Sequence, residues 1–270
     1  MIEPAVAGVI GWPIKHSKSP LIHRFWLGKL GIDGDYSRFP VVPEKLSDFL
    51  VALPAMGLRG VNVTIPHKLA VMPHLNALAA GAAAVGAVNT IIVGRDGRLT
   101  GYNTDVAGIT GPASAAMAGR QMLLVGSGGA ARAAAAAAIA GRASVLWIMA
   151  RDIDAATALQ ASTGLPGGVM ALGGALPADI GLVFNATSLG MVGQPPLILD
   201  LSTLPVDAVV FDAVYAPLKT DLLGAAQARG LVTIDGLAML IGQAAQAFHL
   251  FFGAQAPRQH DPELRALLSR

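Results

Sequence analysis

Short apolar runs alternate along this chain with longer amphipathic or alanine-rich runs. Short runs rich in Val, Ile and Leu are typical of buried strands, whereas the longer runs between them have the length of helices. This βαβα order predicts an α/β fold with parallel strands. The predicted strands are 5–11, 36–41, 60–65, 87–93, 98–102, 122–125, 144–149, 182–185, 209–212 and 231–234.

Capping and turn residues place the predicted helices between these strands. Ser19 followed by Pro20 predicts an N-cap and a proline at the first helical position. The pair Asp96-Gly97 predicts a tight hairpin turn. The predicted helices are 20–30, one from about residue 43, 104–117, 129–140, 154–161, 219–229, 237–252 and 262–268.

Composition limits the class of protein. A chain of 270 residues that is 53% apolar suits two domains with sizeable cores. Arg132 and Arg142 interrupt its most apolar stretch, so no segment approaches the ~18 apolar residues of a membrane-spanning helix. The first residues lack the pattern of a signal peptide, and the chain has no Cys. We therefore expect a cytoplasmic protein without disulfides.

The charge pattern argues against a macromolecular partner. The net charge is +2, only 5% of residues are aromatic, and no Lys/Arg cluster follows a helix. We therefore expect neither nucleic-acid nor membrane binding, but a small-molecule substrate. The expected oligomeric state is a monomer or homodimer, which the charge pattern does not decide. We also expect no metal site, because the candidate ligands come from different elements and lack metal-ligand spacing. These are His16, His23, His67 and His74.

A glycine-rich turn before the predicted helix 129–140 has the pattern G-x-G-x-x-A of a dinucleotide-binding loop. Gly126 would make the tight turn, Gly128 would let the backbone approach a pyrophosphate, and Ala131 would keep the helix close to the strand. The alternative is a plain strand–helix turn. The predicted cofactor residues of this loop are Gly126, Ser127, Gly128, Gly129, Ala130 and Ala131.

Arg151 and Asp152, at the end of the next predicted strand, bear on the choice between NADP and NAD. An Arg at this place accommodates the 2′-phosphate of NADP, whereas an acidic residue binds the ribose hydroxyl of NAD. Because the chain has both, the residues alone leave the two cofactors nearly even. A third interpretation is that both residues only cap the following helix.

Three further motifs carry polar residues near predicted strand ends, where open α/β sheets bind ligands. Two of these residues are Lys68 and Asp105, and a Lys and an Asp beside a nicotinamide cofactor suggest proton transfer coupled to hydride transfer. The simpler interpretations are an N-cap for Ser19, a surface side chain for Lys68 and a first-turn acid for Asp105. The motifs are SKSP with Ser17 and Ser19, NVTIPHK with Asn62, Thr64 and Lys68, and NTD ending at Asp105.

Two amides lie within apolar predicted elements. Asn89 lies in the strand 87–93, where a buried amide must find hydrogen-bond partners. Gln243 lies in the apolar helix 237–252. The alternatives to a binding role are neighbouring backbone partners for Asn89 and a solvated helix face for Gln243.

The motifs SKSP, NVTIPHK, NTD and GSGGAAR together closely resemble the shikimate dehydrogenase family, and they occur in the family's order between Gly8 and Phe252. The resemblance implies an N-terminal α/β substrate domain, residues 1–104 and 237–270. It also implies a C-terminal Rossmann-like dinucleotide-binding domain, residues 105–236, with a cleft separating the two. The implied activity is the reversible NAD(P)-dependent reduction of 3-dehydroshikimate to shikimate, in aromatic amino-acid biosynthesis.

The same resemblance implies roles for individual residues. Ser17 and Ser19 would bind the substrate carboxylate, Lys68 would exchange a proton with the reacting oxygen, and Asp105 would pair with Lys68 and bond a substrate hydroxyl. Gln243 would bind a ring hydroxyl. The remaining implied residues are Asn62, Thr64, Asn89 and Tyr215 for the substrate, and Thr187 and Gly236 for the cofactor.

Two alternatives remain open beside this assignment. The usual cofactor of the family favours NADP, but Ala150, Asp152 and Ala155 depart from the residues usual in the family. An NAD-dependent quinate/shikimate dehydrogenase is therefore the nearest alternative, supported by Asp152 and opposed by Ser19. The alternative of another class is a non-catalytic nucleotide-sensing protein on the same fold, which Lys68 and Asp105 oppose.

Overall fold

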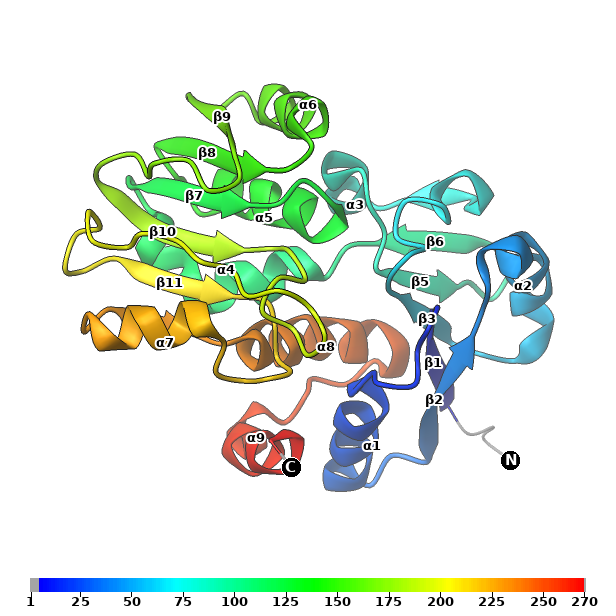
Figure 1. Cartoon of the computed structure of the whole chain (residues 1–270). Helices are drawn as coiled ribbons and strands as arrows, with labels where there is room; N and C mark the ends of the chain where they lie inside the picture. The colour runs from blue at the N-terminus through cyan, green and yellow to red at the C-terminus, as the bar shows by residue number, and fades with distance from the viewer. Residues whose placement is uncertain (1–4, 270) are drawn as a thin grey trace. The chain divides into compact units, whose positions relative to one another are not determined.

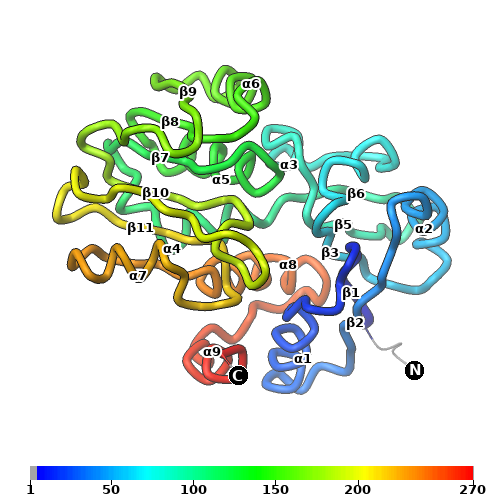
Figure 2. Tube along the Cα trace, viewed as in Figure 1, coloured from blue at the N-terminus to red at the C-terminus, as the bar shows by residue number. Residues whose placement is uncertain are grey.

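The computed structural model describes residues 5–269, which form two compact units, each with its own six-stranded sheet. One unit comprises the described parts of Met1–Thr104 and Gln243–Arg270, and the other comprises Asp105–Gly242. Residues 1–4 and Arg270, at the ends of the predicted substrate domain, lie outside the described residues. Figure 2 lets the chain be followed through both units. The functional division into a substrate and a dinucleotide domain stays a prediction.

The first unit has a mixed sheet. Strand β1, second from one edge, runs parallel to β2 and β3, whereas β5 is antiparallel to β3 and β6, and β4 is parallel to β6. The ends of β1, β3 and β6 and the beginning of β5 therefore meet at one edge. In spatial order the strands are β2 (Gly34–Pro40), β1 (Ala5–Gly11), β3 (Gly60–Val63), β5 (Thr90–Val93), β6 (Leu99–Tyr102) and β4 (Ala77–Leu78).

Helices from both ends of the chain complete this unit. On α8, Ala247 and Phe251 pack in one apolar cluster with Val9 of β1 and Tyr36 of β2. Helix α9 lies beside α1, joined by a salt bridge from Lys29 (Figure 1). The helices are α1 (Ser19–Leu30), α2 (Leu46–Ala52), α3 (Ala80–Val85), α8 (Gly236–Phe252) and α9 (Asp261–Leu268), with 3₁₀ turns at Pro43–Lys45, Leu53–Met56, Met72–His74 and Arg258–His260.

The second unit has a wholly parallel sheet. Its first strand along the chain, β7, lies in the middle beside β10, so the strand order reverses between them (Figure 1). Such a switch point is where doubly wound sheets bind their ligands. In spatial order the strands are β12 (Val232–Ile234), β11 (Val209–Asp212), β10 (Ile180–Asn185), β7 (Gln121–Val125), β8 (Val145–Ala150) and β9 (Gly167–Ala171).

Small residues let the helices of the second unit pack closely. The alanines Ala131, Ala134 and Ala138 of α5 are fully buried, which allows a close approach of the helix to its neighbours. On the second turn of α8, a Cβ added to Gly242 would lie 3.0 Å from the Gly108 Cα of α4. The helices that lie wholly in this unit are α4 (Asp105–Met117), α5 (Gly129–Ala140), α6 (Ile153–Thr163) and α7 (Asp221–Ala228).

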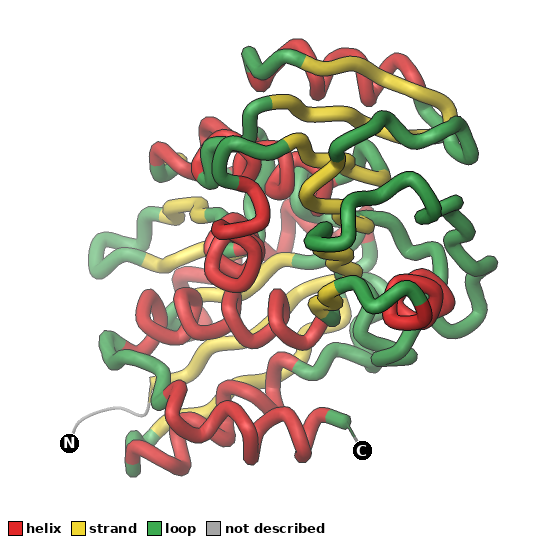
Figure 3. The backbone as a smooth tube through the Cα atoms, turned by 90° about the vertical axis from the view of Figure 1, so that its left-hand side faces the viewer, coloured by secondary structure: helices red, strands yellow, loops and turns green. Residues whose placement is uncertain are grey.

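The predicted alternation of strands and helices is confirmed (Figure 3), as is the hairpin at Gly97, whose φ is +76°. The predicted N-cap at Ser19 is wrong: Lys18 occupies the cap position without a side-chain hydrogen bond, and Ser19 is the first helical residue. The sequence pattern did not predict β4, α3 or β9. None of the described helices combines the length and apolar character needed to span a membrane.

Candidate functional site

Four polar segments meet at the edge of the first unit's sheet where β1, β3 and β6 end. Ser17 and Ser19 follow β1, Lys68 follows β3, and Thr104 follows β6. Asn89 immediately precedes β5, which runs the other way and so begins at this edge. The strand directions therefore bring predicted substrate residues from distant motifs to one place.

Asn62, on β3, is a hydrogen-bonding centre of this edge and is only 6% exposed. Its Oδ1 accepts from the Tyr36 hydroxyl at 2.6 Å, and its Nδ2 donates to the Asn89 carbonyl at 3.1 Å and to Thr90 Oγ1 at 2.9 Å. Both Nδ2 hydrogens thus have protein partners. The observed contacts give Asn62 a supporting role, holding β2 and the Asn89 segment against β3.

Asn89 joins this centre to Thr104 and Gln243. The Asn89 Oδ1 accepts from the Thr104 backbone N–H at 2.7 Å, and its Nδ2 donates to Thr104 Oγ1 at 2.9 Å. Thr104 Oγ1 in turn lies 3.4 Å from Gln243 Oε1 of α8. The structure therefore brings Asn89 and Gln243 together through a threonine that the sequence analysis did not select.

Ser17 and Ser19 are also brought together, with 3.3 Å between their hydroxyl oxygens. Arg38 of β2 holds their loop by donating to the Ser17 carbonyl at 3.0 Å, and the Lys18 ammonium donates to the Leu268 carbonyl of α9. Burial raises the pKa of Tyr36 well above its usual value, and a hydrogen bond with Ser19 acts in the opposite direction. A neutral Tyr36 phenol thus supports Ser19 as well as Asn62.

Lys68 and Thr64 lie on a half-buried segment whose backbone is fixed. Thr64 N–H donates to the Ile10 carbonyl at 3.0 Å, and the Lys68 carbonyl accepts from Val88 N–H at 2.9 Å. His67, which lies between them in the sequence, is buried, and its Nε2 lies 2.7 Å from the Val41 carbonyl oxygen. Lys68 is therefore held by a well-anchored turn at the same edge as Asn89.

Among residues 5–269, no group of three or more His, Asp or Glu side chains could hold a metal ion.

With one exception, the predicted residues of the second unit follow the carboxyl ends of its parallel strands. Asp105 is the exception: it is the first residue of α4 and only 4% exposed. Gly126 follows β7, Arg151 and Asp152 follow β8, and Thr187 follows β10. Tyr215 and Gly236 likewise follow β11 and β12. Burial raises the pKa of the half-buried Tyr215, which therefore stays neutral at physiological pH.

The glycine loop has the geometry that a dinucleotide requires. Gly126 adopts a φ of +115°, and a Cβ there would come within 3.0 Å of Thr187 Cγ2. Gly128 occupies the N-cap of α5, and a Cβ there would meet nothing within 4 Å. Open space therefore faces a helix N-terminus, where backbone N–H groups can bind a phosphate. Ala131 is fully buried on the other side of the turn. These residues fit an NAD(P) pyrophosphate.

Asp152 caps the next helix, as the third interpretation of this segment proposed. Its Oδ1 accepts from Ala155 N–H at 2.9 Å at the start of α6. Arg151 and Asp152 are both exposed, so the cap does not remove either charge from the strand end. The capping role explains an acidic side chain here without a contact to NAD.

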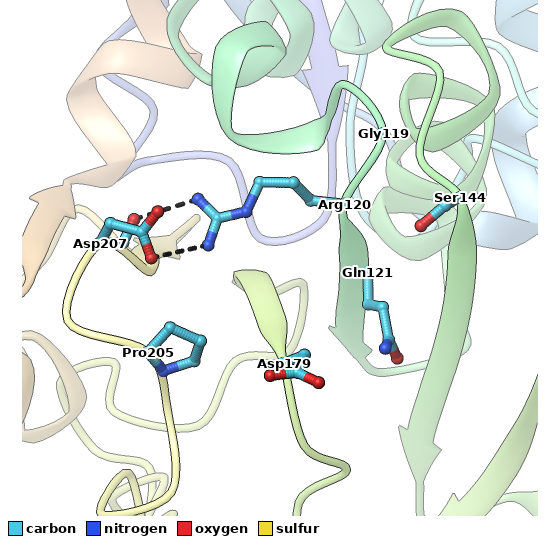
Figure 4. A pocket seen from close by; sticks show the side chains of 7 residues that line it. All are labelled: Gly119, Arg120, Gln121, Ser144, Asp179, Pro205 and Asp207. Atoms are coloured by element: carbon cyan, nitrogen blue, oxygen red, sulfur yellow. Dashed lines mark hydrogen bonds and ion pairs between the residues drawn. The ribbon is translucent and has the colours of Figure 1, made fainter.

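A pocket of about 400 Å³ lies at the opposite, amino-terminal edge of the same sheet (Figure 4). There Arg120 pairs with Asp207 at 2.9 Å, and the Arg120 stem packs where a Cβ on Gly181 would stand. None of the predicted site residues lines it. We assign function to the carboxyl-terminal edge, because open α/β sheets bind ligands there. The pocket is lined by Gly119, Arg120, Gln121, Ser144, Asp179, Pro205 and Asp207.

Comparisons with known proteins agree with this geometry. A family model described as the shikimate dehydrogenase substrate binding domain matches residues 9–91. Over 264 residues the chain is 52% identical to a protein named shikimate dehydrogenase (NADP(+)) from Sphingopyxis alaskensis, covering 97% of this chain and 96% of that one.

Solved structures extend the likeness to the fold. Shikimate 5-dehydrogenase from Thermus thermophilus in complex with NADP(H) and shikimate is 32% identical, with a TM-score of 0.86 over 98% of this chain and 99% of that chain. Quinate dehydrogenase from Corynebacterium glutamicum in complex with NAD is 31% identical, with a TM-score of 0.88 over 98% and 99%. Both folds cover both units of the present chain.

Proposed function

The chain belongs to the shikimate dehydrogenase family, and we propose that it catalyses the reversible NADP-dependent reduction of 3-dehydroshikimate to shikimate. The observation that carries the proposal is the 52% identity over 97% of the chain to a protein of that name. The cluster of Ser17, Ser19, Lys68 and Asn89 at one sheet edge supports it. In this role the protein would serve aromatic amino-acid biosynthesis.

The proposed chemistry divides between cofactor and protein. Bound NADPH would supply the hydride to the substrate carbonyl carbon. Lys68 gives a proton to the oxygen as negative charge develops there, and takes it back in the oxidation of shikimate. Asp105 supplies the carboxylate that assists Lys68. A single general acid of this kind contributes roughly 10²- to 10⁴-fold to the rate.

Hydroxyl and amide groups position the substrate in this proposal. The uncharged hydroxyls of Ser17 and Ser19 donate to its carboxylate, and Gln243 binds a ring hydroxyl. Asn89, Thr64, Asn62 and Tyr215 complete the substrate site, with Asn62 acting chiefly as a support. The supporting observation is that both Asn62 Nδ2 hydrogens have protein partners.

NADP is the proposed cofactor. The glycine loop would hold its pyrophosphate through the backbone from Gly126 to Ala131, and the exposed Arg151 would meet its 2′-phosphate. Thr187 and Gly236 would complete the cofactor site. The cap formed by Asp152 supports this choice, because it gives the acidic residue a structural task. A cytoplasmic location and a monomeric or homodimeric state stay predictions.

The first test is turnover of the wild-type protein with shikimate and with quinate, each with NADP and with NAD. We expect the highest kcat/KM with shikimate and NADP. We expect Lys68→Ala to lower kcat by roughly 10²-fold or more, because it removes the general acid. Lys45→Ala is the matched control: Lys45 belongs to the same unit but is exposed and pairs only locally with Asp48, so its kcat should not change.

Three outcomes would change the assignment. Preferred turnover of quinate with NAD would replace it by the quinate/shikimate alternative. Absence of turnover by a folded protein that still binds NADP would favour a nucleotide-sensing protein. An unchanged kcat in Lys68→Ala would remove Lys68 from the proton-transfer step while leaving the reaction in place.

A further inference from the structure

One buried acidic side chain of the second unit has no role in the site as proposed above. Asp212, the last residue of β11, is 0% exposed, and among residues 5–269 it forms no salt bridge to Lys, Arg or His. Burial raises its pKa, and hydrogen bonds from Thr220, Val214 and Asn185 act in the opposite direction. Since burying a carboxyl group without a cation is costly, these hydrogen bonds must compensate for the lost water.

Asp212 accepts three hydrogen bonds from three different segments. Its Oδ1 accepts from Asn185 Nδ2 at 2.9 Å and from Val214 N–H at 3.0 Å. Its Oδ2 accepts from Thr220 Oγ1 at 2.6 Å, and Thr220 caps α7. One carboxyl group therefore joins the ends of β10 and β11 to the beginning of a helix.

The first branch leads to the glycine loop. Asn185 is fully buried, and its Oδ1 accepts from Thr187 N–H at 3.0 Å and from Thr187 Oγ1 at 2.7 Å. The methyl group of Thr187 stands against Gly126, where an added Cβ would be only 3.0 Å away. Asp212 thus orients Asn185, Asn185 fixes the Thr187 turn, and that turn forms one wall beside Gly126.

The second branch leads to the segment that carries Tyr215. Val214, whose N–H bonds to Asp212, directly precedes Tyr215. The carbonyl oxygens of Ala213 and Val214 would lie 2.4 and 2.5 Å from a Cβ on Gly236, so this backbone fills the space in front of Gly236. The same carboxyl group therefore sets the backbone beside a second predicted cofactor residue.

We propose that Asp212 is a positioning residue for cofactor binding, which holds the Thr187 turn through Asn185 and the Tyr215 segment through Val214. The inference rests on the proposed function for the identity of the cofactor. Asp212 itself touches no reacting atom in this scheme. Its removal loosens two segments beside the cofactor site and leaves the serine and lysine motifs of the first unit unchanged.

The test compares Asp212→Ala with Thr220→Val by calorimetric titration of NADP and by steady-state kinetics. Asp212→Ala removes the acceptor of Val214 N–H and one of the two acceptors of Asn185 Nδ2, which keeps only the Leu189 carbonyl at 3.2 Å, so we expect the Kd for NADP to rise at least tenfold. Thr220→Val removes only the branch to α7, so we expect a lower melting temperature with a Kd within twofold of wild type. Asp212→Asn keeps an oxygen for Asn185 and Val214, and should restore the Kd to within threefold.

A Kd for NADP within twofold of wild type in Asp212→Ala, with only the melting temperature lowered, would overturn the proposal. Equal increases in Kd for Asp212→Ala and Thr220→Val would do the same, because they would show general loosening. If Asp212→Ala does not fold, Asn185→Ser breaks the first branch one step nearer to Thr187 and takes its place. Wild-type turnover of shikimate tests the proposed function separately, since NADP titration needs no turnover.

Discussion

His23 illustrates how burial determines the chemistry of a single side chain. It is fully buried, neither ring nitrogen has a hydrogen-bond partner, and its ring stacks on Tyr36 with 4.1 Å between ring centroids. Phe248 and Phe251 also lie next to it. Burial lowers the pKa of His23 from 6.5 to about 3. The folded protein therefore keeps a neutral ring against Tyr36, which in turn supports Ser19 and Asn62.

This burial predicts a pH dependence of stability. Between pH 6.5 and 3 the unfolded chain binds a proton at His23 that the folded protein does not, so the free energy of unfolding falls as the pH falls. The loss from this group is about 2 kcal/mol between pH 7.5 and 5.0. His23→Phe should abolish that part of the dependence, measured by urea unfolding at both pH values.

The control for this measurement is His74→Phe, because the His74 side chain is exposed to solvent. It should keep the wild-type difference between the two pH values. If His23→Phe kept that difference as well, the acid sensitivity would arise from other groups. Either result leaves the proposed reaction untouched, since the ring contacts of His23 are with Trp26, Tyr36 and the phenylalanines of α8, none of which has a role in it.

At this scale the sequence shows which residue types are present but not which of them meet. Lys68, Asn89 and Gln243 could be selected because they stand in recognisable motifs. Tyr36, Thr104 and Asp212 could not, because their roles depend on hydrogen bonds to other elements, such as those from Asn89 to Thr104, from Thr104 to Gln243 and from Asn185 to Asp212. Buried polar groups need partners, but the partner's identity comes from the fold.

At the scale of elements, the close approach of α4 and α8 depends on glycine. A Cβ on Gly242 would stand 3.0 Å from the Gly108 Cα, and backbone cannot move aside as a flexible side chain can. Such overpacking typically costs about 1–3 kcal/mol. The two glycines therefore fix how near these helices lie.

Gly242→Val should lower the free energy of unfolding by about 1–3 kcal/mol, because the added branched side chain forces α8 away from α4. Gly28→Val provides the control: Gly28 lies on α1, and an added Cβ there meets nothing within 4 Å. It should leave stability unchanged or raise it slightly, since Val is a better helix former than Gly. Equal losses in the two variants, measured by chemical unfolding, would show that helix packing at Gly242 is not limiting.

The elements that the sequence did not predict have weak patterns. Strand β9 is GGVMA at a sheet edge and nowhere fully buried, so it lacks both apolar alternation and a continuous apolar run. Helix α3, AGAAAV, is short and shows no apolar period. In contrast, β1 and α5 were predicted at their observed limits, because their composition contrasts with the turns on either side. The apolar pattern of the sequence identifies elements whose composition contrasts with their surroundings, whereas elements without such a pattern form because of their tertiary packing.

At the scale of the whole molecule, the predicted substrate residues and the predicted cofactor residues fall largely into different units. Ser17, Ser19, Lys68, Asn89 and Gln243 belong to the first unit, and the glycine loop belongs to the second. The family resemblance predicts this separation of tasks, which stays a prediction. The return of the chain to the first unit within α8 could be expected only from the family resemblance, because the residues themselves showed no more than an apolar helix that contains Gln243.

Hydrogen exchange with each ligand alone checks the separation. NADP should slow exchange in 121–131, 150–152, 185–190 and 234–237, because the proposed cofactor residues lie in those segments of the second unit. Shikimate should slow exchange in 15–19, 62–69 and 88–90 of the first unit. Protection of the glycine loop by shikimate in the absence of NADP would contradict the assignment of binding tasks to the units.

The interrupted first unit also has a consequence for biosynthesis on the ribosome. Asp105–Gly242 is one continuous segment, so all of its sheet can assemble as soon as that segment has emerged. The first unit begins earlier but lacks α8, whose Ala247 and Phe251 pack against Val9 and Tyr36, until the last part of the chain is made. The nascent chain therefore carries an exposed apolar face of β1 and β2 through the synthesis of the whole second unit. Of the two units, the one translated first is the last to be completed.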